Sequence, residues 1–186
     1  MNIQSSIFLF VIFVFCLFSC ESSEEAYIEP VGLLYAQSFE EETNEFSPYS
    51  NSSQDYKFEW TEEEAFDGKQ SLIIEGLNNS SDFAFWWIPF YDFEIGKPLK
   101  ARIRVKTKDI NGSGFAFNMF ARVKDVTGGV ASGTASRKTT DGEWITIETE
   151  LNKIPEEDFD RIDLYMLLSN NTTGIVYFDK LEIFTE

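Results

Sequence analysis

Hydrophobic and polar residues alternate in several short segments of this chain of 186 residues. Alternation with a period of two is typical of β-strands that bury one face, and clusters of Gly, Asn, Asp and Ser between the segments indicate turns. No long segment shows the period of an amphipathic helix. The pattern therefore predicts an all-β fold, a β-sandwich, with strands that include residues 71–75, 101–107, 115–122, 144–149 and 162–168.

The beginning of the chain has a different pattern. Twelve consecutive apolar residues run from Ile7 to Phe18, fewer than the roughly 20 that cross a bilayer but enough for the core of a secretory signal. The following Leu17-Phe18-Ser19-Cys20 resembles a bacterial lipobox, which implies cleavage before Cys20 and lipid attachment to its thiol. One alternative is an ordinary cleaved signal with an incidental Cys20. Another is an uncleaved membrane helix, which the acidic residues directly after Cys20 disfavour.

The segment after Cys20 is acidic and rich in serine. Residues 21–25 resemble the stretch that follows the lipidated Cys in surface-exported lipoproteins of the Bacteroidetes type, which implies a place outside the cell; a plain disordered tether is the alternative. We divide the chain into a lipoprotein signal peptide at 1–19, a lipidated Cys with its acidic tether at 20–33, and one domain at 34–186. The only other Cys, Cys16, lies in the signal, so we expect no disulfide in the domain.

Charge and composition narrow the function. The formal net charge is −17 at pH 7, and the excess of acidic residues lies mostly before residue 68. An acidic surface repels phosphate backbones, so we expect no nucleic-acid partner. The chain contains no His, which removes the commonest general base, the serine and cysteine triads and ordinary zinc sites. We therefore expect a protein that is not an enzyme.

Four short motifs point to a family. Ser38-Phe39-Glu40 is similar to an opening strand, residues 65–72 to a hairpin containing Asp-Gly-Lys, residues 105–107 to a central strand and residues 174–183 to a closing strand. In this order they resemble the carbohydrate-binding modules with a galactose-binding-like jelly-roll fold. The resemblance implies a jelly-roll sandwich that binds a polysaccharide or oligosaccharide without catalysis.

The same resemblance implies a structural Ca²⁺ ion where the two ends of the domain meet the hairpin. Glu40 and Asp179 match the family's opening and closing carboxylates, and the carbonyl groups of Gly68 and Lys69 would complete a shell of hard oxygen ligands. Lys180 stands where many relatives have a second Asp. The alternative is that Glu40 and Asp179 are ordinary surface acids on edge strands.

Strand alternation also predicts which side chains face a ligand. Aromatic rings stack on sugar rings, and planar polar groups bind hydroxyls in a partly apolar cleft. With Ile103, Met119 and Leu164 directed to the core, their sequence neighbours point to the other face. If these strands are neighbours, one concave face carries Arg104, Asn118, Phe120, Arg122 and Tyr165. The alternative is an ordinary outer face with mixed side chains.

The tryptophans fall into two groups. Trp86 and Trp87 are adjacent, so in a strand they point to opposite faces; we take both as ligand candidates and expect at most one of them in the core. Trp60 and Trp144 are interpreted as structural, and the aromatic residues around the Trp pair mostly as core packing.

Two functions remain. The first is a non-catalytic, glycan-binding lipoprotein anchored to the outer membrane and exposed at the cell surface. The second is a structural or protein-interaction lipoprotein, in which the same sandwich docks a protein partner in the envelope. A polysaccharide lyase or hydrolase is a distant third, because we find no strand with the acidic motif of jelly-roll glycosidases.

Overall fold

The computed structural model describes residues 27–123, 129–152 and 159–185. The predicted signal peptide and Cys20 lie outside this part of the chain. Among these residues, none forms a helix with the length and apolar character needed to cross a bilayer. The secondary structure consists of the strands β1 (Leu33–Gln37), β2 (Ser47–Ser50), β3 (Tyr56–Thr61), β4 (Ser71–Gly76), β5 (Ala84–Phe90), β6 (Leu99–Asn111), β7 (Phe115–Val123), β8 (Gly129–Arg137), β9 (Ile145–Leu151), β10 (Phe159–Leu168) and β11 (Thr173–Phe184).

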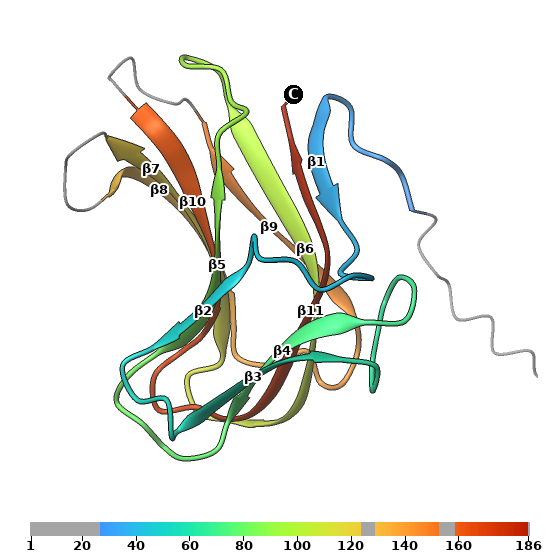
Figure 1. The fold of residues 1–186 in the computed structure, drawn as a ribbon, viewed down its shortest axis with the longest axis vertical. Helices are drawn as coiled ribbons and strands as arrows, with labels where there is room; N and C mark the ends of the chain where they lie inside the picture. The colour runs from blue at the N-terminus through green and yellow to red at the C-terminus, as the bar shows by residue number, and fades with distance from the viewer. Residues whose placement is uncertain (1–26, 124–128, 153–158, 186) are drawn as a thin grey trace, which may run out of the picture.

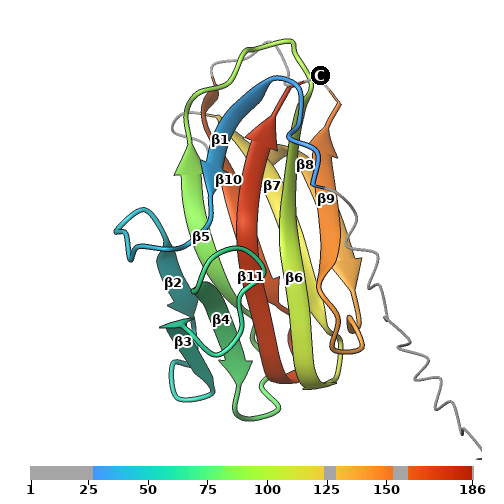
Figure 2. The same ribbon diagram turned by 90° about the vertical axis from the view of Figure 1, so that its right-hand side faces the viewer.

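The strands form two antiparallel sheets that face each other (Figure 1). The first, called sheet A here, has the order β3-β4-β11-β6-β9, with β1 also paired to β11 (Figure 2). The second, sheet B, has the order β2-β5-β10-β7-β8. The predicted all-β sandwich is therefore confirmed.

The core lies between the sheets and is built as the alternation predicts. Ile103 and Val105 of β6, Met119 of β7, and Leu164 and Met166 of β10 all point inward and are fully buried. Burial of each such side chain stabilises the fold by about 1.5–3 kcal/mol. The odd and even positions of these strands were thus assigned to the correct faces.

The opening motif differs from the prediction. Strand β1 ends at Gln37, and Phe39 has a φ of 57°, a left-handed conformation that cannot continue a strand. Its ring is fully buried and lies edge-on to Phe46 and Trp60, with centroids 5.1 and 5.9 Å away. Burial of this ring offsets the roughly 1–2 kcal/mol cost of the left-handed backbone. Ser38-Phe39-Glu40 is therefore the turn after the first strand, and Trp60 has the structural role expected of it.

The chain before β1 is held against sheet A. The Tyr27 ring lies 3.6 Å from Lys180 Nζ, and its hydroxyl donates to the Glu182 carboxylate. Arg102 Nε donates to Glu182 at 2.5 Å, and Arg102 Nη2 donates to the carbonyl of Ile28 at 2.8 Å. These contacts fix the point at which the chain enters the domain on sheet A, across the sandwich from the outer face of sheet B.

Candidate ligand-binding face

The outer face of sheet B brings several predicted residues together. Tyr165 of β10 lies directly opposite Trp87 of β5 on one side and Asn118 of β7 on the other. One step along the strands, Phe120 lies opposite Asp163. Because alternate residues share a face, these side chains form one continuous surface in the middle of the sheet.

This surface contains a hollow of about 450 Å³, here called the aromatic hollow. Tyr49 and Phe83 are 49% and 46% exposed, and each stacks on Phe85, with centroids 5.0 and 5.9 Å apart. Tyr165 stands edge-on to Phe85 at 4.9 Å and to Phe120 at 5.6 Å. The lining residues are Tyr49, Phe83, Phe85, Asn118, Phe120, Arg122, Tyr165 and Leu167.

One end of the aromatic hollow is polar. Arg122 Nε donates to Asp163 at 2.6 Å, and Arg122 Nη2 donates to the Tyr165 hydroxyl at 2.7 Å. That hydroxyl donates in turn to Asp163 at 3.1 Å, and Arg161 Nε donates to the other carboxylate oxygen at 2.8 Å. Asp163 is therefore the centre of a network that holds the Arg122 guanidinium in place beside the rings.

The electrostatics of this end follow from burial and pairing. Burial acts to raise the pKa of Asp163, but Arg122 and Arg161 outweigh it and hold this pKa below its ordinary value. Burial raises the pKa of Tyr165, so the phenol keeps its proton at neutral pH. Asp163 is thus an anion between two permanent cations. Nearby, the buried Oδ1 of Asn118 accepts no hydrogen bond from the described residues.

The arrangement suits one kind of chemistry. Exposed ring faces at Tyr49 and Phe83 can stack on the apolar C–H faces of sugars. Arg122 and Asn118 at the edge of the same hollow can exchange hydrogen bonds with hydroxyl groups. Rings and planar polar groups around an open hollow are a binding arrangement.

Most of the predicted ligand residues lie on this face, and two do not. Trp87 points outward next to the aromatic hollow and also lines an adjacent hollow of about 460 Å³ near Tyr91. Trp86 is 5% exposed, and its Nε1 donates to the carbonyl of Ile73 across the core at 2.9 Å, so it cannot contact a ligand. The expectation that at most one of the two belongs to the core is confirmed.

Arg104 is the second correction. Its strand, β6, belongs to sheet A, whereas β7 and β10 belong to sheet B. Its guanidinium lies 4.4 Å from the centroid of the Phe66 ring, over the opposite outer face of the sandwich. The alternation placed Arg104 on an outer face correctly, but strand pairing is a long-range property that the alternation does not contain.

Sequence reasoning missed other residues of the aromatic hollow. Phe85 lies two positions before Trp87 on β5, so its outward direction was available from the alternation, although it was interpreted as core. Leu167 lies two positions after Tyr165 on β10, so the alternation also directs it outward. Tyr49 lies on β2, which has only four residues and no clear alternation. Phe83 precedes β5 and is carried into the hollow by the loop.

The predicted calcium ligands also meet, at the loop of residues 62–70. Glu40 Oε1 accepts N–H groups from Lys69 at 2.7 Å and Gln70 at 3.1 Å. Gly68 has a φ of 77° and lies so close that a Cβ there would be 2.2 Å from the Glu40 carboxyl carbon. Asp179, fully buried, accepts N–H groups from Phe66 at 2.7 Å, Asp67 at 2.9 Å and Lys180 at 2.6 Å. Both carboxylates thus fasten the same loop to sheet A.

These residues fit a Ca²⁺ shell only in part. Ca²⁺ takes six to eight oxygen ligands, and the described residues include no group of three acidic or other metal-binding side chains placed to hold an ion. Lys180 Nζ lies 2.8 Å from the Asp67 carboxylate, so this ammonium occupies the side of the loop where a second acid would stand. Burial raises the pKa of Asp179 to about 6, with Asp67 adding to the rise and the three N–H groups opposing it. Calcium binding stays a prediction.

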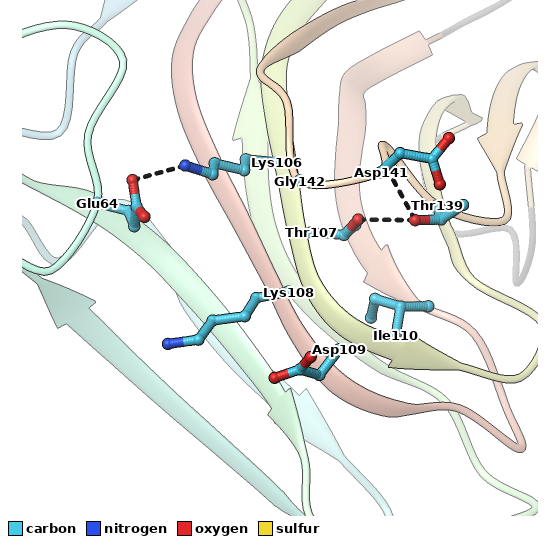
Figure 3. Close-up of a pocket in the computed structure, with 9 residues that line it drawn as sticks. All are labelled: Glu64, Lys106, Thr107, Lys108, Asp109, Ile110, Thr139, Asp141 and Gly142. Atoms are coloured by element: carbon cyan, nitrogen blue, oxygen red, sulfur yellow. Dashed lines mark hydrogen bonds and ion pairs between the residues drawn. The ribbon is translucent and has the colours of Figure 1, made fainter.

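A third hollow lies on sheet A and has a different character (Figure 3). It measures about 390 Å³, and its lining includes Lys106, Lys108, Asp109 and Asp141 but no aromatic residue. Lys106 is paired with Glu64 at 2.8 Å, as drawn in Figure 3. This hollow offers charged groups without a ring face and lacks the chemistry of the aromatic hollow.

Trp144, the other tryptophan interpreted as structural, also lies on the outer side of sheet A, between Phe66 and Tyr177.

Comparison with known proteins identifies the fold. No known protein family matches the sequence, and no curated protein matches it. Among solved structures, the CBM22-1 xylan-binding domain of Xyn10C from Paenibacillus barcinonensis is similar with a TM-score of 0.61 and 19% identity, over 85% of this chain and 97% of that one. The C-terminal family 22 carbohydrate-binding module of Xyn10B from Clostridium thermocellum is similar with a TM-score of 0.58 and 13% identity, over 85% and 97% of the two chains.

The same architecture also occurs in a different setting. The enzymatically active domain of tailspike protein 4 of bacteriophage CBA120 matches with a TM-score of 0.59 and 9% identity, over 77% of this chain and 20% of that one. At such identities the similarity establishes the fold, the jelly roll of carbohydrate-binding modules, and the predicted resemblance is confirmed at that level. The ligand has to be argued from the site, because one fold carries many functions.

Proposed function

We propose that this protein binds a polysaccharide, without catalysis, in the aromatic hollow of sheet B. The observation that carries the proposal is the joining of exposed rings at Tyr49 and Phe83 to Arg122 and Asn118 on one face. Xylan-binding domains with the same fold support the proposal, since they are carbohydrate-binding modules. Xylan is therefore the first polysaccharide to test.

A sugar chain would lie across the strands. Tyr49, Phe85 and Tyr165 follow one another from β2 through β5 to β10, so successive sugar units can meet successive rings. Each such contact removes apolar ring surface from water, which favours binding. Arg122 is already held by Asp163 and Tyr165, so little side-chain entropy is lost when it binds a hydroxyl.

The direct test uses the full chain, purified in a mild detergent. In affinity electrophoresis with xylan and other neutral polysaccharides in the gel, we expect retardation by at least one of them. Tyr49→Ala should weaken the retardation, whereas Lys108→Ala on sheet A should leave it unchanged. No retardation by any polysaccharide would remove the proposal and favour the protein-interaction alternative. Release of reducing ends from the same polysaccharides would instead indicate an enzyme.

We also propose that the protein is exported and anchored to the outer membrane by lipid at Cys20, at the cell surface. The lipobox-like sequence supports this. The contacts of Tyr27 add a consequence, because they hold the chain's entry point on sheet A. An anchor reached through this segment would leave the aromatic hollow directed away from the membrane. Cys20→Ser should move the protein from the membrane fraction to the soluble fraction.

A weakly bound structural Ca²⁺ ion at Glu40 and Asp179 completes the proposal. It is supported by the approach of these two carboxylates to the same loop, from opposite ends of the domain. The carbonyl groups of Gly68 and Lys69 would be the further ligands.

A further inference from the structure

The polar end of the aromatic hollow contains an unusual set of charges. Arg122 and Arg161 both donate to the buried Asp163, at 2.6 and 2.8 Å, through different carboxylate oxygens. Nη1 of Arg161 also lies 3.4 Å from a carboxylate oxygen of Asp160. Two cations and two anions therefore cancel at a place where a ligand's polar groups would arrive.

Pairing also determines which N–H groups of Arg122 remain for a ligand. A free guanidinium binds a carboxylate through two parallel N–H groups. Here Nε is used by Asp163 and Nη2 by the Tyr165 hydroxyl. The guanidinium also lies 5.4 Å from the Phe120 ring centroid and 5.9 Å from that of Tyr165, which fixes its plane. The edge formed by Nε and Nη2 is therefore already occupied, by Asp163 and by the Tyr165 hydroxyl.

We propose that Asp163 is a specificity-determining residue, which makes the aromatic hollow select uncharged sugars over uronic acids by neutralising and occupying Arg122 and Arg161. This inference rests on the proposed function. Asp163 does not touch the ligand and acts through the two arginines, so it is a positioning residue. An acidic sugar would meet no net positive charge in the hollow, and the rest of the chain, with a net charge of −17, would repel it.

The test is a gain of binding in Asp163→Asn. Asparagine has nearly the same shape and keeps one carbonyl oxygen, but it leaves two arginines without their shared anion. In affinity electrophoresis of the full chain in detergent, we expect wild type to be retarded by neutral xylan and not by polygalacturonate. Asp163→Asn should bind polygalacturonate at least about tenfold more tightly than wild type, and added salt should reverse the gain.

Two further variants separate this reading from a general effect of charge. Asp141→Asn makes the same change in net charge at the hollow on sheet A. Asp141 has a left-handed backbone conformation, which Asn tolerates, and this variant should gain no polygalacturonate binding. Asp163→Asn combined with Arg122→Gln should lose most of the gain. A destabilised but folded protein would not acquire salt-sensitive binding of one acidic polymer, so this readout is not moved by a purely structural role.

The outcomes distinguish the inference from the proposed function. If wild type binds xylan and folded Asp163→Asn gains no polygalacturonate binding, the inference is wrong while the function stands. If wild type itself binds polygalacturonate in low salt and releases it in high salt, the inference is also wrong, and this result does not depend on the variant folding. If no form binds any polysaccharide, both fail.

Discussion

The two outer faces of the sandwich are built by the same alternation of residues but end as different surfaces. On sheet B, Phe85, Trp87 and Tyr165 point outward and stay accessible around a hollow. On sheet A, Tyr177 points outward at the same kind of position but is fully buried beneath Trp144 and the nearby loop of residues 62–70. The difference shows that an outward aromatic residue becomes a binding surface only where no loop covers it.

Asp163 on sheet B and Asp179 on sheet A are both buried carboxylates, and their environments differ. Asp163 on sheet B is paired with two arginines, which hold its pKa below the ordinary value against the effect of burial. Asp179 on sheet A accepts three backbone N–H groups, and burial still raises its pKa to about 6. At Asp163 the two arginines outweigh burial, whereas at Asp179 burial outweighs the three N–H groups. Asp163 therefore holds two arginine side chains in place, while Asp179 fastens the loop of residues 62–70.

The largest expected effect separates the two faces of β5. Trp86→Ala should destabilise the protein by about 3–5 kcal/mol, because it leaves a cavity in the core and removes the hydrogen bond to the Ile73 carbonyl. Trp87→Ala, one residue later, should cost much less stability and weaken polysaccharide binding. Urea unfolding followed by fluorescence measures the first effect and affinity electrophoresis the second. Equal losses of stability would contradict the assignment of faces.

The pH dependence of the unfolding free energy should reveal the raised pKa of Asp179 on sheet A. Because its folded pKa of about 6 exceeds the unfolded value of 3.8, the folded state binds more protons between these pH values. Unfolding free energy should therefore fall as the pH rises from about 4 to 6, by about 3 kcal/mol at most. Asp179→Asn should flatten this slope in chelator-containing buffer. The slope from Asp163 has the opposite sign and lies below pH 3.8, where protonation removes its stabilisation.

On sheet B, the central ring should dominate ligand binding. Tyr165→Ala removes a ring between Phe85 and Phe120 and the hydroxyl that supports Arg122. We expect a loss of about 2 kcal/mol, or about thirtyfold in affinity for the polysaccharide that wild type binds best. Tyr165→Phe keeps the ring and should retain most of the affinity. Isothermal titration with a soluble oligosaccharide would measure both, and an unchanged affinity in Tyr165→Ala would move the site elsewhere.

The loop of sheet A offers a smaller effect through Lys180. In wild type, this ammonium pairs with Asp67, so Ca²⁺ at about 1 mM, the range of extracellular modules, should raise the melting temperature only slightly over chelator. Lys180→Asp supplies another carboxylate and should enlarge the Ca²⁺-dependent shift. The charge-matched control is Lys97→Asp, in the connection between β5 and β6. If Ca²⁺ stabilises neither wild type nor Lys180→Asp, the proposed ion is absent.

The smallest expected effect concerns Arg104. Arg104→Gln should leave polysaccharide affinity within about twofold of wild type, since surface substitutions remote from a site change energies by about 0.5 kcal/mol or less. Its position over Phe66 on sheet A is the reason. A large loss of binding would mean that the ligand extends over sheet A, and the contrast between the two faces would have to be redrawn.

The features that the sequence by itself determined are those that depend on local chemistry. Successive side chains of a strand point to opposite faces for covalent reasons, so Trp86 and Trp87, or Tyr165 and Met166, could be separated without coordinates. The sequence motifs also predicted that Glu40 and Asp179 lie at one hairpin, and both carboxylates accept N–H groups of the loop of residues 62–70. The lack of His in the sequence also favoured binding over catalysis.

Only the tertiary structure decided which strands are neighbours. That choice moved Arg104 to sheet A, added Tyr49 and Phe83 to the aromatic hollow, and placed Arg122 beside Asp163. It depends on contacts between residues far apart in the chain and on the loops that cover or expose each sheet. A period of two residues carries no information about either, because it describes one strand at a time.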